Sequence, residues 1–318
     1  MYFLTSIVKH WFLVSIAFAS AFGYLQPEIG NTLLTYNILT IGLVLSFFLT
    51  GLLLESQVVL EGFKSLKALA VAIISALIFY PAIAWLFTSQ FHSYELLVGC
   101  CIIAAGPVTV SSGTILTALA RGNIPLSVFI CIFTHFLAVF TIPFILDILL
   151  GAGAGVVLPV FEILLGLVLK VLLPLVIGQL VKPFLKRGID AFRRPASIFQ
   201  SCMILLMIMT AVASSAASLK QMGDFLVFVV AVVVTLHLFM LLFNYGIARL
   251  IRLDRPSLIA FTIHTPQKTL GVSYIVWAGF FAADYPAAFV PAIVCHLCQM
   301  ITGTLVAEHF RKNHDPEF

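Results

Sequence analysis

Ten stretches of apolar residues, each close to the length of a membrane span, fill almost the whole chain and constrain its fold more than any other feature. A helix needs about 20 apolar residues to cross the hydrocarbon layer of a membrane. Hydrophobic residues make up 62% of the 318 residues and charged residues 9%, where a soluble domain carries about a quarter charged residues. The sequence therefore predicts an all-α polytopic membrane protein. The ten spans are expected at residues 8–24, 35–54, 68–88, 94–119, 124–149, 156–181, 196–218, 225–248, 257–282 and 286–307.

The placement of lysine and arginine orients these spans. Cytoplasmic loops of membrane proteins carry an excess of both residues. With the N-terminus in the cytoplasm, a single basic residue, Lys220, falls outside, so both termini are expected in the cytoplasm and the protein in the cell membrane. The basic residues on the inner side are Lys9, Lys64, Lys67, Arg121, Lys182, Lys186, Arg187, Arg193, Arg194, Arg249, Arg252, Arg255, Arg311 and Lys312. Lys170 and Lys268 lie within spans.

Two of the predicted spans are interrupted by proline in the middle. Pro107 follows Gly106 in the fourth span, and Pro266 lies 159 positions after Pro107, in the ninth. Proline lacks a backbone N–H and clashes with the preceding turn, so each of these spans should consist of two half-helices. Non-helical backbone at membrane depth is tolerated only where it is buried in protein or lines a watery cavity. Broken helices at corresponding positions of two halves are typical of the binding site of a secondary transporter.

The number and content of the spans predict how they are arranged. Because each half has an odd number of spans, the halves point in opposite directions across the membrane. We expect one transmembrane domain, residues 1–318, built from inverted five-helix repeats at about 1–150 and 156–310, with the broken helix 4 facing the broken helix 9. Polar residues gather in spans 4, 5, 9 and 10, whereas spans 6 to 8 are mostly apolar. This asymmetry favours a polar core of helices 3–5 and 8–10, and an apolar panel of helices 1, 2, 6 and 7 that moves against it.

The polar residues near the two breaks are the candidate site, because polar groups at membrane depth are unfavourable unless they have partners. A single Ser or Thr commonly bonds back to its own helix, but unwound backbone needs polar neighbours. Lys268 is the most informative of them, since an ammonium in mid-span must snorkel, pair, lose its proton or meet water. It is expected to replace a bound cation or carry an exchanged proton, with a structural tie as the alternative. The predicted substrate- or ion-binding residues are Thr109, Ser111, Ser112, Thr114, Ser127, His264, Thr265, Gln267, Lys268, Thr269, His296 and Gln299.

No pattern typical of an enzyme or a metal site accompanies these residues. The chain has no His-x-x-x-His motif and no paired carboxylates in its spans. Cys295, His296 and Cys298 are potential metal ligands, but neighbouring residues of a helix point to different faces, so a packing role is expected. No cofactor is expected beyond a coupling ion, Na⁺ or H⁺. The expected partners are a small-molecule solute and membrane lipid, without nucleic acid, and the oligomeric state stays open.

Several local sequences resemble the bile acid/sodium symporter family. They are Pro107-Val108 with Ser111-Ser112, the residues 116–123 with 126–128, the residues 204–208, Gln267-Lys268-Thr269-Leu270, and His296-x-x-Gln299-x-x-x-Gly303. Over essentially its full length the chain resembles the orphan branch of that family, which holds its seventh human member and bacterial relatives. The resemblance implies a secondary transporter for which bile acid itself is not the physiological substrate.

The resemblance also indicates where sodium ligands would fall. In the bile-acid branch the second break carries a Glu-x-x-x-Gln-Asn stretch, and a gap-free comparison puts His264 at the glutamate and Lys268-Thr269 at the Gln-Asn pair. Shifting the alignment of the ninth span by one residue would instead place Gln267 at the glutamine of that stretch. Around the first break, Thr114 takes an asparagine position, Ser127 keeps a hydroxyl and Cys131 replaces a threonine. Either way the acidic ligand is missing, and an ammonium opposes sodium binding.

The sequence leaves three functions open. The leading one is a secondary active transporter that moves a small organic, anionic solute by alternating access, with Lys268 and the amino ends of half-helices attracting the anion. The second is a sodium-independent, proton-coupled or cation/proton antiporter-like exchanger, in which Lys268 titrates. The third is a membrane sensor or regulator that keeps the fold without transporting. Solute-gated ion flux would separate the transporters from the sensor.

Overall fold

The computed structural model describes residues 11–54, 65–110, 112–154, 157–185, 189–223 and 225–312. Within these residues the fold is all-helical, and the extended backbone forms one isolated bridge rather than a sheet. Six helical segments are long and apolar enough to cross a membrane, or seven when the bent pair α3 (Pro27–Thr35) and α4 (Ile38–Leu53) counts as one. These six are residues 66–88, 124–151, 160–185, 191–220, 225–250 and 286–312. The apolar helices α2 (Trp11–Leu25), α8 (Tyr94–Ala105) and α16 (Leu270–Phe280) are shorter.

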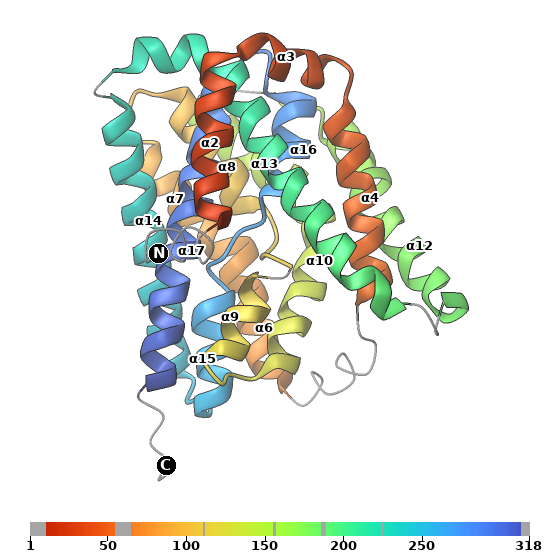
Figure 1. Cartoon of the computed structure of the whole chain (residues 1–318). Coiled ribbons are helices and arrows are strands. Elements are labelled where there is room, and N and C mark those ends of the chain that lie inside the picture. The colour runs from red at the N-terminus through yellow and green to blue at the C-terminus, as the bar shows by residue number, and fades with distance from the viewer. Residues whose placement is uncertain are drawn as a thin grey trace, which may run out of the picture.

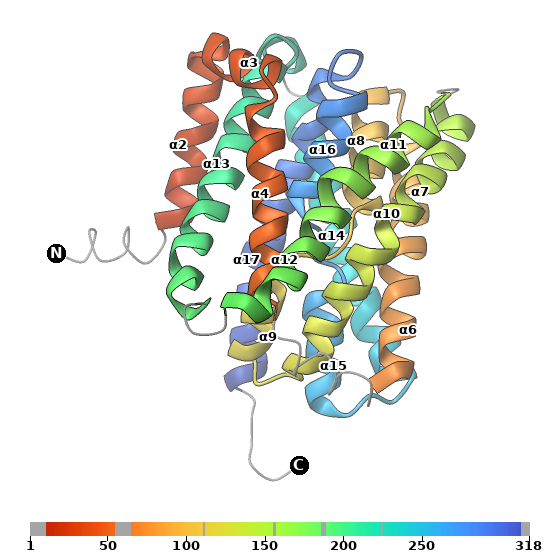
Figure 2. The ribbon, with the colours of Figure 1, turned by 90° about the vertical axis from the view of Figure 1, so that its right-hand side faces the viewer.

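The first group of packed helices consists of α2, α3, α4, α12 (Leu173–Val181) and α13 (Ile189–Met222). Helix α13 packs along α2, α3 and α4, and α4 packs on α12 (Figure 2). Gly51 makes the close approach of α4 and α12 possible, because a Cβ there would lie 2.0 Å from the carbonyl oxygen of Leu175. Helix α13 begins earlier than the predicted span at 196–218 and continues through Pro195. The described residues just before that predicted span are therefore helical rather than a loop.

The second group is built around α8 and α10 (Ile124–Ala154). Helix α7 (Tyr80–Thr88) packs on α8, and α8 packs on α10 and on α17 (Val290–Lys312). Helix α14 (Phe225–Leu250) covers α15 (Arg255–His264) and α17. One continuous helical segment connects α10 to the first group. It consists of α11 (Val160–Leu167), the π-turn η3 (Val168–Leu172) and α12.

The helix before α7 carries a local irregularity that matters for the site. Helix α6 (Leu66–Ile74) continues into the π-turn η2 (Ser75–Phe79), where the Tyr80 amide donates to the Ser75 carbonyl five residues back. The next residue is Pro81, which has no N–H to donate. The carbonyl of Ala76 is thereby left for a partner outside its helix.

Both proline breaks lie at mid-height of the molecule. Helix α8 ends at Ala105 and α9 (Ser112–Leu119) follows, while α15 ends at His264 and α16 follows from Leu270. Figures 1 and 2 show α8 and α16 in the upper half and α9 and α15 in the lower half. The two non-helical stretches, residues 106–110 and 265–269, run antiparallel where they meet, at the isolated bridge between Val108 and Lys268. We call these two stretches the crossing.

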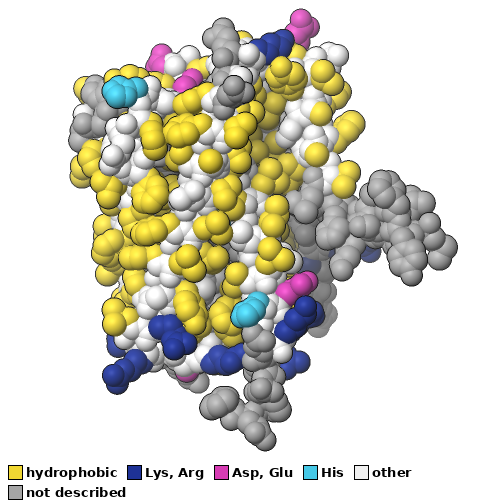
Figure 3. All heavy atoms as spheres, turned by 90° about the vertical axis from the view of Figure 1, so that its left-hand side faces the viewer, with side chains coloured by type: hydrophobic (Ala, Val, Ile, Leu, Met, Phe, Trp, Pro, Cys, Tyr) yellow, Lys and Arg dark blue, Asp and Glu magenta, His cyan; other side chains and the backbone are white. Residues whose placement is uncertain are grey.

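Apolar and basic side chains occupy different parts of the surface between the upper and lower ends of the molecule. Figure 3 shows a broad hydrophobic face with lysine and arginine gathered mainly at its lower end. Large apolar side chains such as Phe18, Phe161 and Val227 are each 70% exposed, which suits a lipid environment rather than water.

Candidate functional site

Backbone hydrogen bonds join the two breaks directly. The amide of Thr109 donates to the carbonyl of Gln267 at 3.2 Å, and the amide of Thr269 donates to the carbonyl of Pro107 at 3.1 Å. Backbone freed by the two prolines thus finds partners in the other break, as buried backbone must. Segments about half a chain apart are held together at the centre of the protein.

Gln267 reinforces this pairing with its side chain. Its Oε1 accepts hydrogen bonds from the hydroxyls of Thr109 at 3.2 Å and Ser112 at 3.1 Å. The Thr109 hydroxyl in turn accepts from the Gly113 amide near the start of α9, at 3.1 Å. The Gln267 Nε2 is buried and has no hydrogen-bond partner among the described residues.

His264 is the last residue of α15 and lies fully buried beside α9. Its Nε2 donates to the Thr109 carbonyl at 2.7 Å, since a carbonyl only accepts, and its Nδ1 lies 2.6 Å from the Ser127 hydroxyl. Ser127 also contacts the Thr114 hydroxyl at 3.3 Å. Gly113 makes room for the ring, because a Cβ there would lie 2.0 Å from the imidazole Cδ2. Hydrogen bonds at both nitrogens therefore hold the His264 ring in place, and Gly113 packs closely against it.

Lys268 is fully buried, and its ammonium is held by backbone oxygens. The Nζ donates to the carbonyl of Ala76 at 2.5 Å and to that of Gly106 at 2.9 Å. It also lies 4.8 Å from the ring centroid of Tyr80, within cation–π range. Gly106 follows the last residue of α8, so the positive charge lies at the negative end of that helix.

Gln299 of α17 holds the backbone of Lys268. Its Oε1 accepts from the Lys268 amide at 2.7 Å, and its Nε2 donates to the Lys268 carbonyl at 2.8 Å. The same Nε2 lies 3.1 Å from Nδ1 of His296, which must therefore accept. The remaining ring nitrogen of His296, Nε2, then carries the hydrogen, and it has no hydrogen-bond partner among the described residues.

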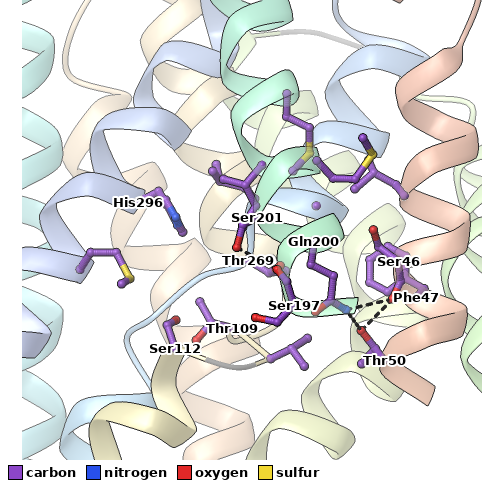
Figure 4. A pocket seen from close by; sticks show the side chains of 18 of the residues that line it. Ser46, Phe47, Thr50, Thr109, Ser112, Ser197, Gln200, Ser201, Thr269 and His296 are labelled. Carbon is purple, nitrogen blue, oxygen red and sulfur yellow. Dashed lines mark hydrogen bonds between the residues drawn. The ribbon is translucent and has the colours of Figure 1, made fainter. Parts of the chain in front are cut away.

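A cavity of about 300 Å³ lies between the crossing and the helices α4 and α13, and we call it the central pocket (Figure 4). From the crossing side, Thr109, Ser112, Thr269 and His296 line it. In Figure 4, His296 faces Ser46, Thr50 and Gln200 from the opposite wall. The remaining lining residues are Leu43, Phe47, Val110, Ile115, Leu116, Ser197, Ser201, Met203, Ile204, Met207, Leu270, Gly271 and Met300.

The polar residues on the α4 and α13 wall were missed by the sequence analysis, which treated these helices as apolar. Ser197, Gln200, Ser201 and Ile204 recur at helical spacing and so share one face of α13. The Gln200 Nε2 donates to the Ser46 carbonyl at 3.2 Å and to the Thr50 hydroxyl at 2.9 Å, which ties α13 to α4. The helical spacing of these polar residues could have indicated a polar face. Their neighbours are so apolar, however, that the average composition of the span did not show it.

The predicted site residues fall into two sets. Thr109, Ser112, Thr269 and His296 line the central pocket, and Thr114 lines an adjoining cavity. A second, buried set holds the crossing together and consists of Ser127, His264, Gln267, Lys268 and Gln299. Thr265 is buried, and its hydroxyl has no partner among the described residues. Ser111 lies outside the described residues.

The chemistry of the site is that of binding. No Asp or Glu occurs among the described residues that line the central pocket. Among the described residues, no three His, Cys, Asp or Glu side chains group as a metal site would require. The site offers hydroxyls, an amide, an imidazole and apolar surface to a small molecule.

Membrane-capable helices around a pocket at two joined helix breaks define a membrane transport protein. Residues 10–312 match the SBF-like CPA transporter family, and the chain belongs to that family. It is thus a multi-pass membrane protein, and a transporter of the bile acid/sodium symporter type rather than an enzyme. The resemblance seen in the local sequences is confirmed.

Similar proteins occur in animals and plants. Sodium/bile acid cotransporter 7 of Xenopus tropicalis is 26% identical over 321 aligned positions, covering 95% of this chain and 92% of the relative. The protein of the same name from Mus musculus is 26% identical, covering 94% and 91%. The probable sodium/metabolite cotransporter BASS4, chloroplastic, of Arabidopsis thaliana is 26% identical, covering 92% of this chain and 71% of the relative.

Proposed function

We propose that this chain is a secondary active transporter that moves a small organic, anionic solute by alternating access. The observation that carries the proposal is the central pocket, which lies where the crossing meets α4 and α13. The names of the relatives, sodium/bile acid and sodium/metabolite cotransporters, support a small-molecule solute.

We further propose that ten spans form two inverted repeats, with α8–α9 and α15–α16 each acting as one broken span. This arrangement is supported by the helix ends at Ala105 and His264, next to the two prolines. In this view the group of α2, α4, α12 and α13 is the panel, and the helices around the crossing are the core. Movement of the panel against the core would open the pocket to alternate sides.

The charge of the solute is inferred from the lining of the pocket. Among the described residues, none that lines it is acidic, and the first residues of α9 and α16 lie at its wall. Helix amino ends attract negative charge. An adjoining cavity, which shares Thr50, Val110 and Gln200 with the central pocket, is lined by Arg193.

We propose His296 as the solute's main hydrogen-bond donor, because its Nε2 is buried without a partner among the described residues and its ring lines the pocket. In proteoliposomes with imposed sodium and pH gradients, uptake of bile acid and of small carboxylates is measured for the natural chain and His296→Leu. The variant is expected to lower uptake about tenfold, the effect of losing a hydrogen bond to a charged group. Met300→Leu, a lining residue on the same helix, is the matched control and should change uptake less than about twofold.

The same assay separates the functions. Solute uptake that His296→Leu leaves unchanged would contradict the role of His296. Absence of uptake for every solute under both gradients would contradict transport and favour the sensor.

We also propose that both termini lie in the cytoplasm, which is supported by the basic side chains at the lower end of Figure 3. In a Cys202→Ser background, cysteine replaces Lys220 at one end of the helices or Arg252 at the other. In intact cells a membrane-impermeant maleimide is expected to label the cysteine at 220 and to spare that at 252, by the positive-inside rule. Labelling with the opposite preference would invert the topology.

A further inference from the structure

The names of the relatives imply sodium as a coupling ion, for which the crossing would have to supply oxygen ligands. Sodium, a hard cation, needs several oxygen atoms that are free to coordinate it. The Thr109 carbonyl is occupied by His264, and the Gln267 Oε1 by the hydroxyls of Thr109 and Ser112. The backbone carbonyls of Gln267 and Pro107 accept hydrogen bonds from the amides of Thr109 and Thr269. These oxygens already accept hydrogen bonds from donors of the chain itself, and the Thr265 hydroxyl, which has no partner among the described residues, is one free oxygen where sodium needs several. The residues therefore do not fit a sodium site.

One place at the crossing does have the surroundings of a bound monovalent cation, and Lys268 fills it. Two backbone carbonyls, those of Ala76 and Gly106, point at the Nζ, and the Tyr80 ring covers it at 4.8 Å. The Ala76 carbonyl is available because of the π-turn and Pro81, and the Gly106 carbonyl because α8 ends there. Among the described residues the Nζ contacts no carboxylate, so backbone dipoles and the Tyr80 ring balance its charge.

We infer that the Lys268 ammonium is the resident cation of the crossing. It takes the place of an exchangeable monovalent ion, and the crossing assembles without a dissolved cation. Three segments depend on it, since the Nζ joins the π-turn of α6–α7 to the end of α8 and its own backbone continues into α16. The inference deepens the proposed function, on which its relevance to transport rests, by making the coupling independent of sodium at this site.

The test uses chemical rescue of stability, which needs no transport. Lys268→Ala removes three methylenes and the ammonium, the size of n-propylammonium, and leaves a void lined by the two carbonyls and the ring. The purified variant in detergent is expected to melt at least about 5 °C below the natural chain, because buried carbonyls lose their donor. Propylammonium chloride should recover at least about half of that loss, as a ligand bound only by the folded state does. Neutral n-propanol at the same concentration should not.

Two further variants control for shape and for lysine itself. Lys268→Met fills the void without charge, so it should melt below the natural chain and gain nothing from propylammonium. Lys170→Met removes the other lysine of the predicted spans, which is partly exposed in the π-turn η3, and should leave the melting temperature nearly unchanged. The natural chain itself should melt at the same temperature in sodium, potassium and choline chloride.

The results decide the inference in either direction. It is overturned if Lys268→Met is as stable as the natural chain, if propanol rescues as well as propylammonium, or if sodium stabilises the natural chain above potassium and choline. If Lys268→Ala does not fold, the methionine variant and the salt series still decide it. A chain that moves no solute yet shows the rescue would lose the proposed function and keep the resident cation.

Discussion

Replacing Gln299 by leucine is expected to lower the free energy of unfolding by about 2 to 6 kcal/mol, because two buried backbone groups lose their partner, at about 1 to 3 kcal/mol each. Gln299 bonds both the amide and the carbonyl of Lys268, at 2.7 and 2.8 Å, and it is fully buried. Leucine is close in size, so the effect reports the lost hydrogen bonds rather than a cavity. Thermal unfolding of the purified protein in detergent, followed by circular dichroism, measures it.

Two other substitutions on α17 make the result specific. Gln299→Glu keeps an acceptor for the Lys268 amide and loses the donor to its carbonyl, so its effect should be intermediate. Thr304→Val removes a hydroxyl that bonds only back to the Met300 carbonyl of its own helix, and should change stability by less than about 1 kcal/mol. If Gln299→Leu were no worse than Thr304→Val, Gln299 would not hold the crossing.

Gly113→Ala is expected to destabilise the protein by about 3 kcal/mol, the upper range for overpacking a buried site. The added Cβ would lie 2.0 Å from Cδ2 and 2.4 Å from Nε2 of His264. The ring has little freedom to move, because Thr109 and Ser127 hold its two nitrogens. We also expect solute uptake to fall, since the Thr109 side of the pocket would shift with the ring.

A double-mutant cycle tests whether the clash with His264 is the cause. His264→Ala removes the ring, so adding Gly113→Ala to it should have little further effect, and the two effects should fail to add by about 1 to 3 kcal/mol. Gly246→Ala is the matched control, because a Cβ there meets nothing within 4 Å. It should be neutral or slightly stabilising, as alanine favours helix over glycine. Additive effects of Gly113→Ala and His264→Ala would show that the strain lies elsewhere.

The predicted site residues have two different roles, which only their contacts in the structure distinguish: some hold the crossing together and others line the central pocket. Lys268 was expected to attract the solute, replace a bound cation or carry an exchanged proton, with a structural tie as the alternative. Its ammonium bonds the carbonyls of Ala76 and Gly106, and Lys268 is not among the residues that line the central pocket. His296 was among the predicted binding residues, and the structure adds that its Nε2 lacks a partner among the described residues and that its ring lies at the wall of the central pocket. Polarity at membrane depth shows that a residue needs a partner, and it does not say whether that partner is protein or solute.

Composition and the hydrophobic stretches by themselves determined a multi-pass helical membrane protein, because only helices satisfy their own backbone within lipid. The two prolines determined where helices end, because the missing N–H and the ring clash act within a turn of the chain. Only the tertiary structure decided which groups meet there. The Ala76 carbonyl that holds Lys268 lies 192 residues away in sequence, and the Gln200 wall of the pocket comes from helices whose average composition is apolar. Such contacts depend on how distant helices pack, which no local pattern encodes.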